Sequence, residues 1–137
     1  TLLQSIPGID PFFSVLILYE IDDISRFRGE KKLCAYAGLV PSTHASGGKV
    51  FHGKITKTGS KWLRWAAIAA AHTAVRSDSE FRAYYQRIMV RKGTNAAKVA
   101  TARRLLTIIY RLLRQKRFYE RRTTPKKIET PAALVIV

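Results

Sequence analysis

The sequence predicts a mainly α-helical domain, and three observations indicate this fold class. Residues that commonly cap helices precede several apolar stretches, apolar residues recur at helical spacing in the second half, and glycine concentrates in one central segment. A chain of 137 residues, 47% of them hydrophobic, is long enough for one domain with a buried core. The predicted order is a helix-hairpin-helix start, a central Gly-rich basic loop and then three helices.

Residues 1–28 have the pattern of a helix-hairpin-helix. A short helix over Leu2–Ile6 stops at Pro7-Gly8, and Asp10 caps a second helix, Pro11–Glu20. In this motif the turn offers backbone N–H groups to a DNA phosphate. Asp10 stands where a second glycine is usual, and its carboxylate opposes phosphate binding. We therefore interpret the turn as a packing element, and a contact with DNA stays open.

The central segment, residues 38–61, differs in composition from its surroundings. It follows a cap or turn at Asp22-Asp23 and a predicted helix over Glu30–Ala37, which Gly38 ends. Glycine, serine and threonine dominate it, and no Asp or Glu occurs between Glu30 and Asp78. These residues predict a loop, with room for a short hairpin in Val50–Thr56.

Three helices are predicted after this loop: one from Lys61 to about Arg76 capped by Ser60, one capped by Asp78 that runs to Lys92 and is ended by Gly93, and a long one capped by Asn95 that reaches Arg117 or beyond. One face of the last helix is apolar, at Val99, Ala102, Leu105, Leu106, Ile109, Leu112 and Leu113. Arginines gather opposite, at Arg103, Arg104, Arg111, Arg114, Arg121 and Arg122. From residue 123 to 137 we expect an extended or partly disordered tail.

The charge of the chain is large and unevenly placed. Lys and Arg number 25 against 9 Asp and Glu, for a net charge of +16, yet residues 1–25 contain no base. Such a surface suits a polyanion, of which nucleic acid is the commonest, although a solvated face is the plain alternative. No apolar run approaches the 20 or so residues of a membrane span. The single cysteine, Cys34, excludes an internal disulfide and fits a reducing compartment.

The central loop carries the strongest candidate chemistry. Ser46 precedes two glycines, which leave its hydroxyl accessible, and cations surround it without an acid nearby. This setting favours a serine alkoxide and stabilises charge on a phosphodiester, whereas the plain reading is a flexible turn whose lysines only hold a phosphate. The candidate phosphate-binding residues here are Lys49, Lys54, Lys57, Lys61 and Arg64, and on the last helix Arg103, Arg104, Arg111 and Arg114. His44 and His52 flank Ser46 and are candidates for proton transfer.

From Leu2 to about Tyr119 the chain resembles the C-terminal transposase domain of the insertion-sequence family numbered one hundred and ten. The segments that carry the resemblance are Ile6–Ile9, Glu20–Phe27, Ala37–Ser42, Ser46–Lys49, Gly53–Arg64 and the terminal Ala-x-x-Leu-Leu helix. This resemblance implies a domain over residues 1–122, with the catalytic loop at 38–61 and the helical part at 61–122.

The resemblance also implies a function, a DNA transposase or recombinase that uses a serine nucleophile and is guided by a bridge RNA. The nucleophile position falls on Ser46, with Ser42 and Ser60 as poorer matches. Mg²⁺ is expected in the full-length protein, held by carboxylates of an N-terminal resolvase-like half, and no cofactor is expected in this chain alone. DNA, guide RNA and a homo-oligomer are the expected partners, with no membrane, in the cytoplasm of a prokaryote. We expect this chain alone to bind nucleic acid without cutting it.

A second function class stays open, a non-catalytic DNA- or RNA-binding module in which the same cations only clamp phosphates. Other side chains are interpreted as structural. We expect Cys34 to be buried and Trp62 and Trp65 to pack in the core, although one tryptophan can also stack on a base. Tyr84, Tyr85 and Tyr110 are interpreted as residues at the edge of the core, with a tyrosine nucleophile as a rival to be tested. No zinc site is predicted.

Overall fold

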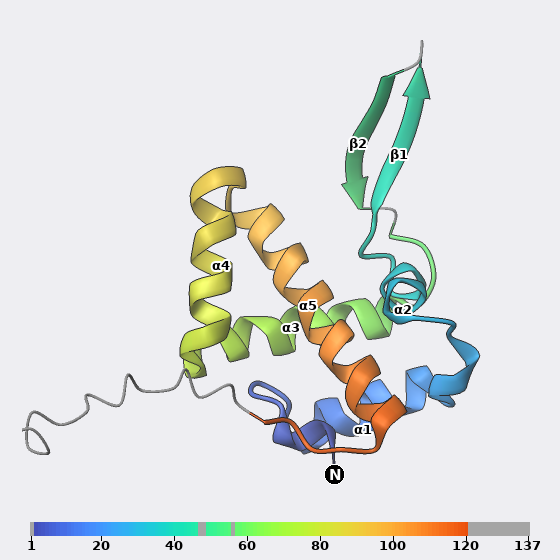
Figure 1. Cartoon of the computed structure of the whole chain (residues 1–137), viewed down its shortest axis with the longest axis vertical. Coiled ribbons are helices and arrows are strands. Elements are labelled where there is room, and N and C mark those ends of the chain that lie inside the picture. The colour runs from blue at the N-terminus through green and yellow to red at the C-terminus, as the bar shows by residue number, and fades with distance from the viewer. Residues whose placement is uncertain (1, 47–48, 56, 121–137) are drawn as a thin grey trace, which may run out of the picture.

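The computed structural model describes residues 2–46, 49–55 and 57–120, with side chains outside 41–54, and confirms the mainly α-helical class (Figure 1). Its helices are α1 (Pro11–Ile21), α2 (Glu30–Tyr36), α3 (Lys61–Ser77), α4 (Ser79–Lys92) and α5 (Thr94–Gln115), with two short 3-10 helices, η1 (Leu3–Ser5) and η2 (Ile24–Arg26). Its strands are β1 (Pro41–Ser46) and β2 (Lys49–Ile55). The predictions for Arg121, Arg122 and the tail lie outside the described residues.

The core lies where the long helix α5 crosses α3 and also packs on α2 and α4. Its apolar face is buried as predicted, since Leu105, Leu106 and Ile109 are fully covered. Facing them, α3 offers alanines, of which Ala66, Ala67, Ala70, Ala71 and Ala74 are buried. Small side chains let the two helix backbones approach closely, so an alanine-rich sequence forms a core helix here.

Side-chain caps fix most helix starts where the sequence predicted them. Asp10 accepts from Phe13 N–H (2.8 Å), Ser60 from Leu63 N–H (3.1 Å) and Asp78 from Phe81 N–H (3.1 Å). The prediction that Asn95 caps the last helix was wrong, because the cap residue is Gly93 and α5 begins at Thr94. The same helix ends at Gln115 and not at Arg117. The next residue, Lys116, has a left-handed backbone conformation.

The turn at Gly8, between η1 and α1, packs against α3, which agrees with its interpretation as a packing element. Gly8 has φ +89°, and a Cβ placed on it would collide with the Ala70 carbonyl and lie 2.8 Å from Ala74 N. Its backbone therefore lies directly on the α3 backbone, which only glycine allows at this φ. This contact fixes the start of the chain to the core.

The central segment is more regular than predicted, because it forms an antiparallel hairpin instead of a loop with one short hairpin. The strands pair from Pro41 with Ile55 to Ser46 with Lys49, with a register shift between Pro41 and Thr43. Predicted boundaries at Val50–Thr56 therefore missed β1 altogether. The Gly-rich composition predicted a loop, because glycine weakens a strand, and so the sequence did not indicate these two strands. Figure 1 shows the hairpin projecting from the helical body.

Candidate nucleic-acid interface

The predicted site residues fall into two groups, one on or beside the hairpin and one along α5. Ser46 is the last residue of β1 and its backbone pairs with Lys49 at the far end of the hairpin. Thr43, and not His44, pairs with His52, so the two histidines occupy neighbouring positions of the ladder. The side chains of these residues and of Lys54 lie outside the described part of the structure.

At the base of the hairpin, three predicted cations stand near the start of α3. Lys57 and Lys61 are exposed, and the Lys61 ammonium lies 5.4 Å from the centre of the Trp62 ring. Arg64 is half-buried and donates to the Ala37 carbonyl oxygen at 3.3 Å. Lys57 and Lys61 are therefore positioned for solvent or phosphate, whereas Arg64 also ties α3 to the end of α2.

Ser60 has a structural role. Its hydroxyl donates to Glu20 Oε2 at 2.8 Å and accepts from Leu63 N–H at 3.1 Å, so it caps α3 and joins it to α1. Both hydrogen-bonding functions of the hydroxyl are occupied within the protein. This arrangement does not favour Ser60 as a nucleophile.

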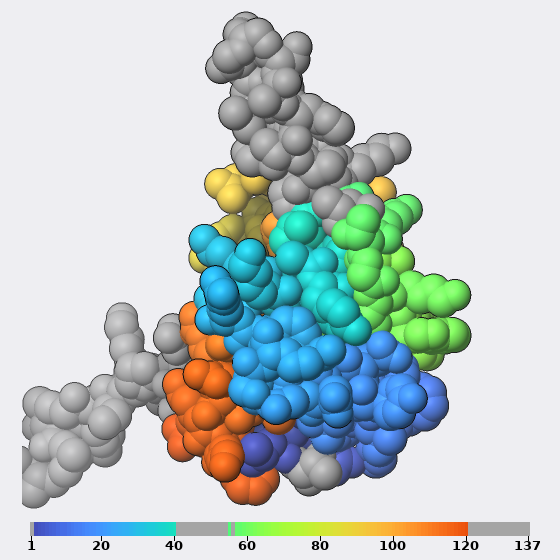
Figure 2. All heavy atoms as spheres, turned by 90° about the vertical axis from the view of Figure 1, so that its right-hand side faces the viewer, coloured from blue at the N-terminus to red at the C-terminus, as the bar shows by residue number. Residues whose placement is uncertain are grey.

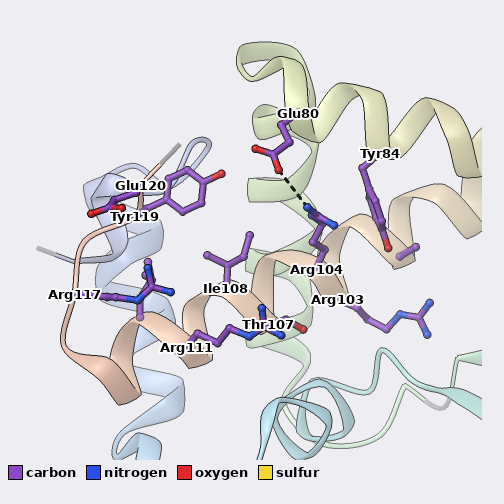
Figure 3. Close-up of a pocket in the computed structure, with 12 residues that line it drawn as sticks. Glu80, Tyr84, Arg103, Arg104, Thr107, Ile108, Arg111, Arg117, Tyr119 and Glu120 are labelled. Carbon is purple, nitrogen blue, oxygen red and sulfur yellow. Dashed lines mark hydrogen bonds and ion pairs between the residues drawn. The ribbon is translucent and has the colours of Figure 1, made fainter. Parts of the chain in front are cut away.

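A groove runs along α5, and arginines dominate its lining (Figure 3). It has a volume of about 730 Å³ and is lined by Glu80, Tyr84, Ala100, Arg103, Arg104, Thr107, Ile108, Arg111, Leu112, Arg117, Tyr119 and Glu120. Three of the four predicted α5 arginines therefore share one groove. Arg114 is exposed but does not line it.

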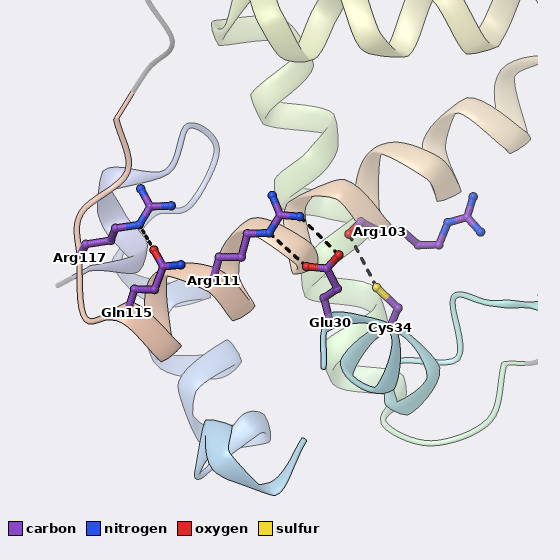
Figure 4. Close-up of polar contacts among 6 residues, drawn as sticks. All are labelled: Glu30, Cys34, Arg103, Arg111, Gln115 and Arg117. Carbon is purple, nitrogen blue, oxygen red and sulfur yellow. Dashed lines mark hydrogen bonds and ion pairs between the residues drawn. The ribbon is translucent and has the colours of Figure 1, made fainter. Parts of the chain in front are cut away.

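Two of these arginines are held by acids of the same chain, which the sequence did not reveal. Arg104 Nη2 lies 3.4 Å from Glu80 Oε1, and its guanidinium stacks 4.6 Å from the centre of the Tyr84 ring (Figure 3). Arg111 makes a two-point contact with Glu30, at 3.1 and 3.4 Å (Figure 4). Both pairs are partly exposed, so a phosphate can replace either carboxylate at small cost.

Sequence reasoning did not place three further residues in this groove, and it considered Tyr84 only in another role. Tyr84 supports Arg104 from α4, and Arg117 and Tyr119 form a wall beyond the end of α5. Tyr119 N–H donates to Ser5 Oγ at 2.8 Å, which fixes this wall to the first turn of the chain. A contact across 114 residues leaves no local signal in the sequence.

Among the side chains interpreted as structural, those of Cys34 and Tyr110 have structural contacts, whereas the two tryptophans are not in the core. Cys34 is buried, its thiol donates to the Arg103 carbonyl oxygen at 3.7 Å, and burial raises its pKa (Figure 4). The Tyr110 hydroxyl donates to the Phe27 carbonyl oxygen at 3.2 Å, which accounts for it structurally. The prediction that Trp62 and Trp65 pack in the core was wrong, since they are 53% and 49% exposed.

The fold and the charge distribution define a class, a small helical domain whose basic hairpin and arginine groove suit a polyanion. None of the helices in the described part of the chain is long and apolar enough to span a membrane. Residues 1–86 match the family model described as Transposase IS116/IS110/IS902 family. The chain belongs to this family of transposases.

Several relatives of the chain have names that refer to insertion elements, transposition or gene inversion. A Streptomyces coelicolor protein named insertion element IS110 uncharacterized 43.6 kDa protein is 30% identical over 95% of this chain and 32% of its own length. The transposase for insertion sequence element IS1111A of Coxiella burnetii is 31% identical over 85% of this chain and 33% of its length. The pilin gene-inverting protein of Moraxella bovis is 35% identical over 89% of this chain and 39% of its length. The chain thus spans about a third of the length of these relatives.

Proposed function

We propose that this chain is the strand-cleaving, nucleic-acid-binding C-terminal domain of a DNA transposase or recombinase, with Ser46 as its nucleophile. The observation that carries the proposal is the position of Ser46 next to the end of a projecting, acid-free basic hairpin. A serine in the helical core has no route to a DNA strand, whereas one at the end of such an arm reaches a bound duplex. Names of relatives, a transposase and a gene-inverting protein, support the reaction class.

The proposed reaction conserves the phosphodiester bond. Ser46 Oγ attacks the phosphorus of a DNA phosphodiester and gives its proton to a base, for which His44 and His52 are the candidates. The bond from phosphorus to one deoxyribose oxygen breaks, and that oxygen takes up a proton and leaves as a hydroxyl. The hydroxyl of another strand then attacks the serine ester, releases Ser46 and rejoins the DNA without ATP.

Cations of this chain stabilise the charge that builds on phosphorus in this reaction. Lys49 and Lys54 on β2 and Lys57 and Lys61 at its base form a positive setting in a stretch with no acid. Arginines of the α5 groove hold further phosphates, of DNA or of the proposed guide RNA. Both nucleic acids present the same phosphate chemistry to this groove.

The described residues do not provide a site for Mg²⁺, since no three His, Cys, Asp or Glu among them come together. Glu20, the acid close to the start of α3, is engaged by Ser60. No step of the reaction is therefore assigned to a metal on these residues. We propose that the metal-binding carboxylates belong to another part of a protein of the relatives' length, and that this chain alone binds nucleic acid without cutting it.

A protein of the relatives' length that carries this domain tests the nucleophile. Ser46→Ala is expected to abolish the covalent protein–DNA link and strand exchange, because alanine has no oxygen to bond phosphorus, while DNA affinity stays within about twofold. Ser42→Ala, in the same strand, is the matched control and keeps both activities. Normal recombination by Ser46→Ala would contradict the assignment.

The alternative function, a non-catalytic nucleic-acid-binding module, is favoured by one observation, the arginine groove. That groove lies on α5 and holds phosphate without any need for Ser46. If Ser42→Ala and Ser46→Ala both recombine normally while loss of the groove arginines abolishes binding, the module is the better account.

A further inference from the structure

Helix α1 is apolar on two opposite faces, although the structure covers only one of them. Ile17 and Ile21 face the core, whereas the opposite face carries Phe12, Val15 and Tyr19, which are 62%, 69% and 80% exposed. A helix that is apolar all round is normally buried all round. The outer face of α1 therefore has the composition of a covered surface.

Helix α3 continues this apolar surface beside α1. Trp62 and Trp65 are about half-exposed, and the Trp65 ring meets Phe12 at 6.4 Å and Phe13 at 5.5 Å between ring centres. Figure 2 shows residues of α1 and of the start of α3 together on one face of the molecule. We call Phe12, Val15, Tyr19, Trp62 and Trp65 the α1–α3 face.

The size of this face is that of an interface. Five large apolar side chains that are half-exposed or more present on the order of 600 Å² of surface. The largest apolar patch on a soluble monomer is typically about 300–600 Å² and is often functional, so this face lies at the upper end of that range, and a standard interface buries about 800 Å² on each partner.

Charge at the rim distinguishes a protein partner from nucleic acid. Residues 1–25, which include α1, contain Asp10, Glu20, Asp22 and Asp23 and no base, so they repel phosphate. Helix α3 contains no acid and carries two exposed bases, Lys61 and Arg76, whereas Arg64 is half-buried and bonded to the Ala37 carbonyl oxygen. One half of the face is acidic and the other basic, which makes the face complementary to itself.

The relative direction of α1 and α3 determines which charged residues of the two copies can face each other. Glu20, near the end of α1, bonds Ser60 at the start of α3, whereas Phe13, near the start of α1, meets Trp65 further along. The helices are thus antiparallel, and the acids that end α1 lie level with the bases that begin α3. A two-fold axis between the helices and parallel to them places α1 of one copy over α3 of the other.

We propose that the α1–α3 face docks a second copy of this chain, in a four-helix contact with Trp65 and Phe12 near its centre. In this contact Asp22 of each copy lies opposite Lys61 of the other. This contact leaves the arginine groove and the two strands of the hairpin free for nucleic acid, whereas Lys61 belongs to both surfaces, so that phosphate and the second copy compete for it. The proposal does not depend on the proposed catalytic role of Ser46.

Sedimentation velocity of the 137-residue chain, without nucleic acid, tests this proposal. Measured in about 0.2 M salt to screen the +16 charge of each copy, the mass is expected to rise from 15.5 kDa toward twice that value between roughly 1 and 200 µM. Emission of the two tryptophans, both in this face, is expected to shift to the blue over the same range. A chain that stays monomeric throughout overturns the proposal.

Variants at exposed positions locate the contact without disturbing the core. Val15→Glu and Tyr19→Glu each bury an unpaired charge in the dimer and are expected to weaken association at least about tenfold. Val90→Glu on α4, where the native side chain is 82% exposed, makes the same kind of change elsewhere and leaves association unchanged. Unchanged association of both α1 variants, or weakened association of the Val90→Glu control, would place the contact elsewhere and overturn the assignment.

Charge reversal tests the predicted orientation. Lys61→Glu places a glutamate opposite Asp22 of the other copy and is expected to weaken the dimer. Adding Asp22→Lys is expected to restore it, because the ion pair across the two-fold axis is then present again with its charges reversed. Failure of the double variant to recover contradicts the antiparallel arrangement. Quenching of both tryptophans by a single-stranded oligonucleotide, with a monomeric chain, assigns the face to nucleic acid and also overturns the proposal.

Discussion

Single residues decide how the start of the chain joins the core, and Gly8 shows this most directly. Its φ of +89° and its contact with the α3 backbone combine two demands that no other residue type meets. Gly93 has a similar φ, +91°, in open space, and Gly29 is unstrained with nothing within 4 Å. Alanine substitutions at these three glycines therefore separate the free-energy cost of a steric collision from that of backbone strain.

Gly8→Ala is expected to lower the free energy of unfolding by about 3 kcal/mol, because both strain and collision apply. Gly93→Ala, with strain alone, is expected to cost about 1 kcal/mol, and Gly29→Ala less than about 0.5 kcal/mol. Thermal unfolding followed by circular dichroism measures this order, at roughly 4 °C per kcal/mol for a domain of this size. Equal melting temperatures for the three variants would contradict the close packing at Gly8.

At this scale the sequence predicted local features and missed those set by packing. Asp10, Ser60 and Asp78 cap helices as expected, because a cap bonds an N–H three residues away. The exposure of Trp62 and Trp65 was not predicted, since it depends on how far α1 covers α3. The sequence pattern of an apolar residue in a helix is the same whether another element of the chain or a second molecule covers its side chain.

Among the elements, α5 joins the core to the arginine groove. Its apolar face was predictable from helical spacing, because that spacing is a local property. The ion pairs of its arginines with Glu30 and Glu80 join residues 81 and 24 positions apart, so composition alone did not reveal them. These acids reduce the positive charge that the groove offers to a phosphate.

Removing this competition is expected to strengthen nucleic-acid binding. Glu30→Gln with Glu80→Gln releases Arg111 and Arg104 from pairs worth about 0.5 kcal/mol each, which raises duplex affinity about fivefold. Fluorescence anisotropy with a labelled duplex measures the change. Asp22→Asn with Asp23→Asn alters the net charge equally away from the groove, and an equal gain in this control would mean that only overall charge matters.

The opposite change tests the groove itself. Arg104→Ala with Arg111→Ala is expected to weaken duplex binding at least about tenfold and to flatten the salt dependence by up to about one unit of slope for each phosphate that is no longer neutralised. The matched pair Arg91→Ala with Lys92→Ala removes two exposed cations from the end of α4 and leaves the groove intact. Similar reductions in affinity for both pairs would show that binding is unspecific attraction to a basic chain.

The hairpin is the element that the sequence described least well. Its glycines predicted a loop, because glycine weakens a strand, yet the pairing extends from Pro41 to Ile55. Strand pairing is stabilised across the ladder and is therefore less visible in one strand than a helix is in its own residues. The short hairpin predicted at Val50–Thr56 therefore overlapped β2 and did not include β1.

For the whole molecule, the net charge of +16 is the sum of regions that differ in sign and in density of charge. The acidic first 25 residues form half of a face suited to a second copy, the acid-free hairpin bears Ser46, and α5 carries the arginine groove. This division was visible in the sequence as blocks of charge. Its arrangement in space needed the fold, because α1 and α3 come together from opposite sides of the hairpin in the sequence.

Mapping the covalent adduct determines whether Ser46 carries the DNA strand, on which the proposed function depends. A protein of the relatives' length that carries this domain is incubated with a suicide DNA substrate, digested with protease and nuclease, and the nucleotide-bearing peptide is sequenced by mass spectrometry. We predict that the nucleotide is linked through phosphate to Ser46. An adduct on Ser42, Ser60, Tyr84 or Tyr85, or recombination with no protein–DNA adduct at all, would contradict this assignment.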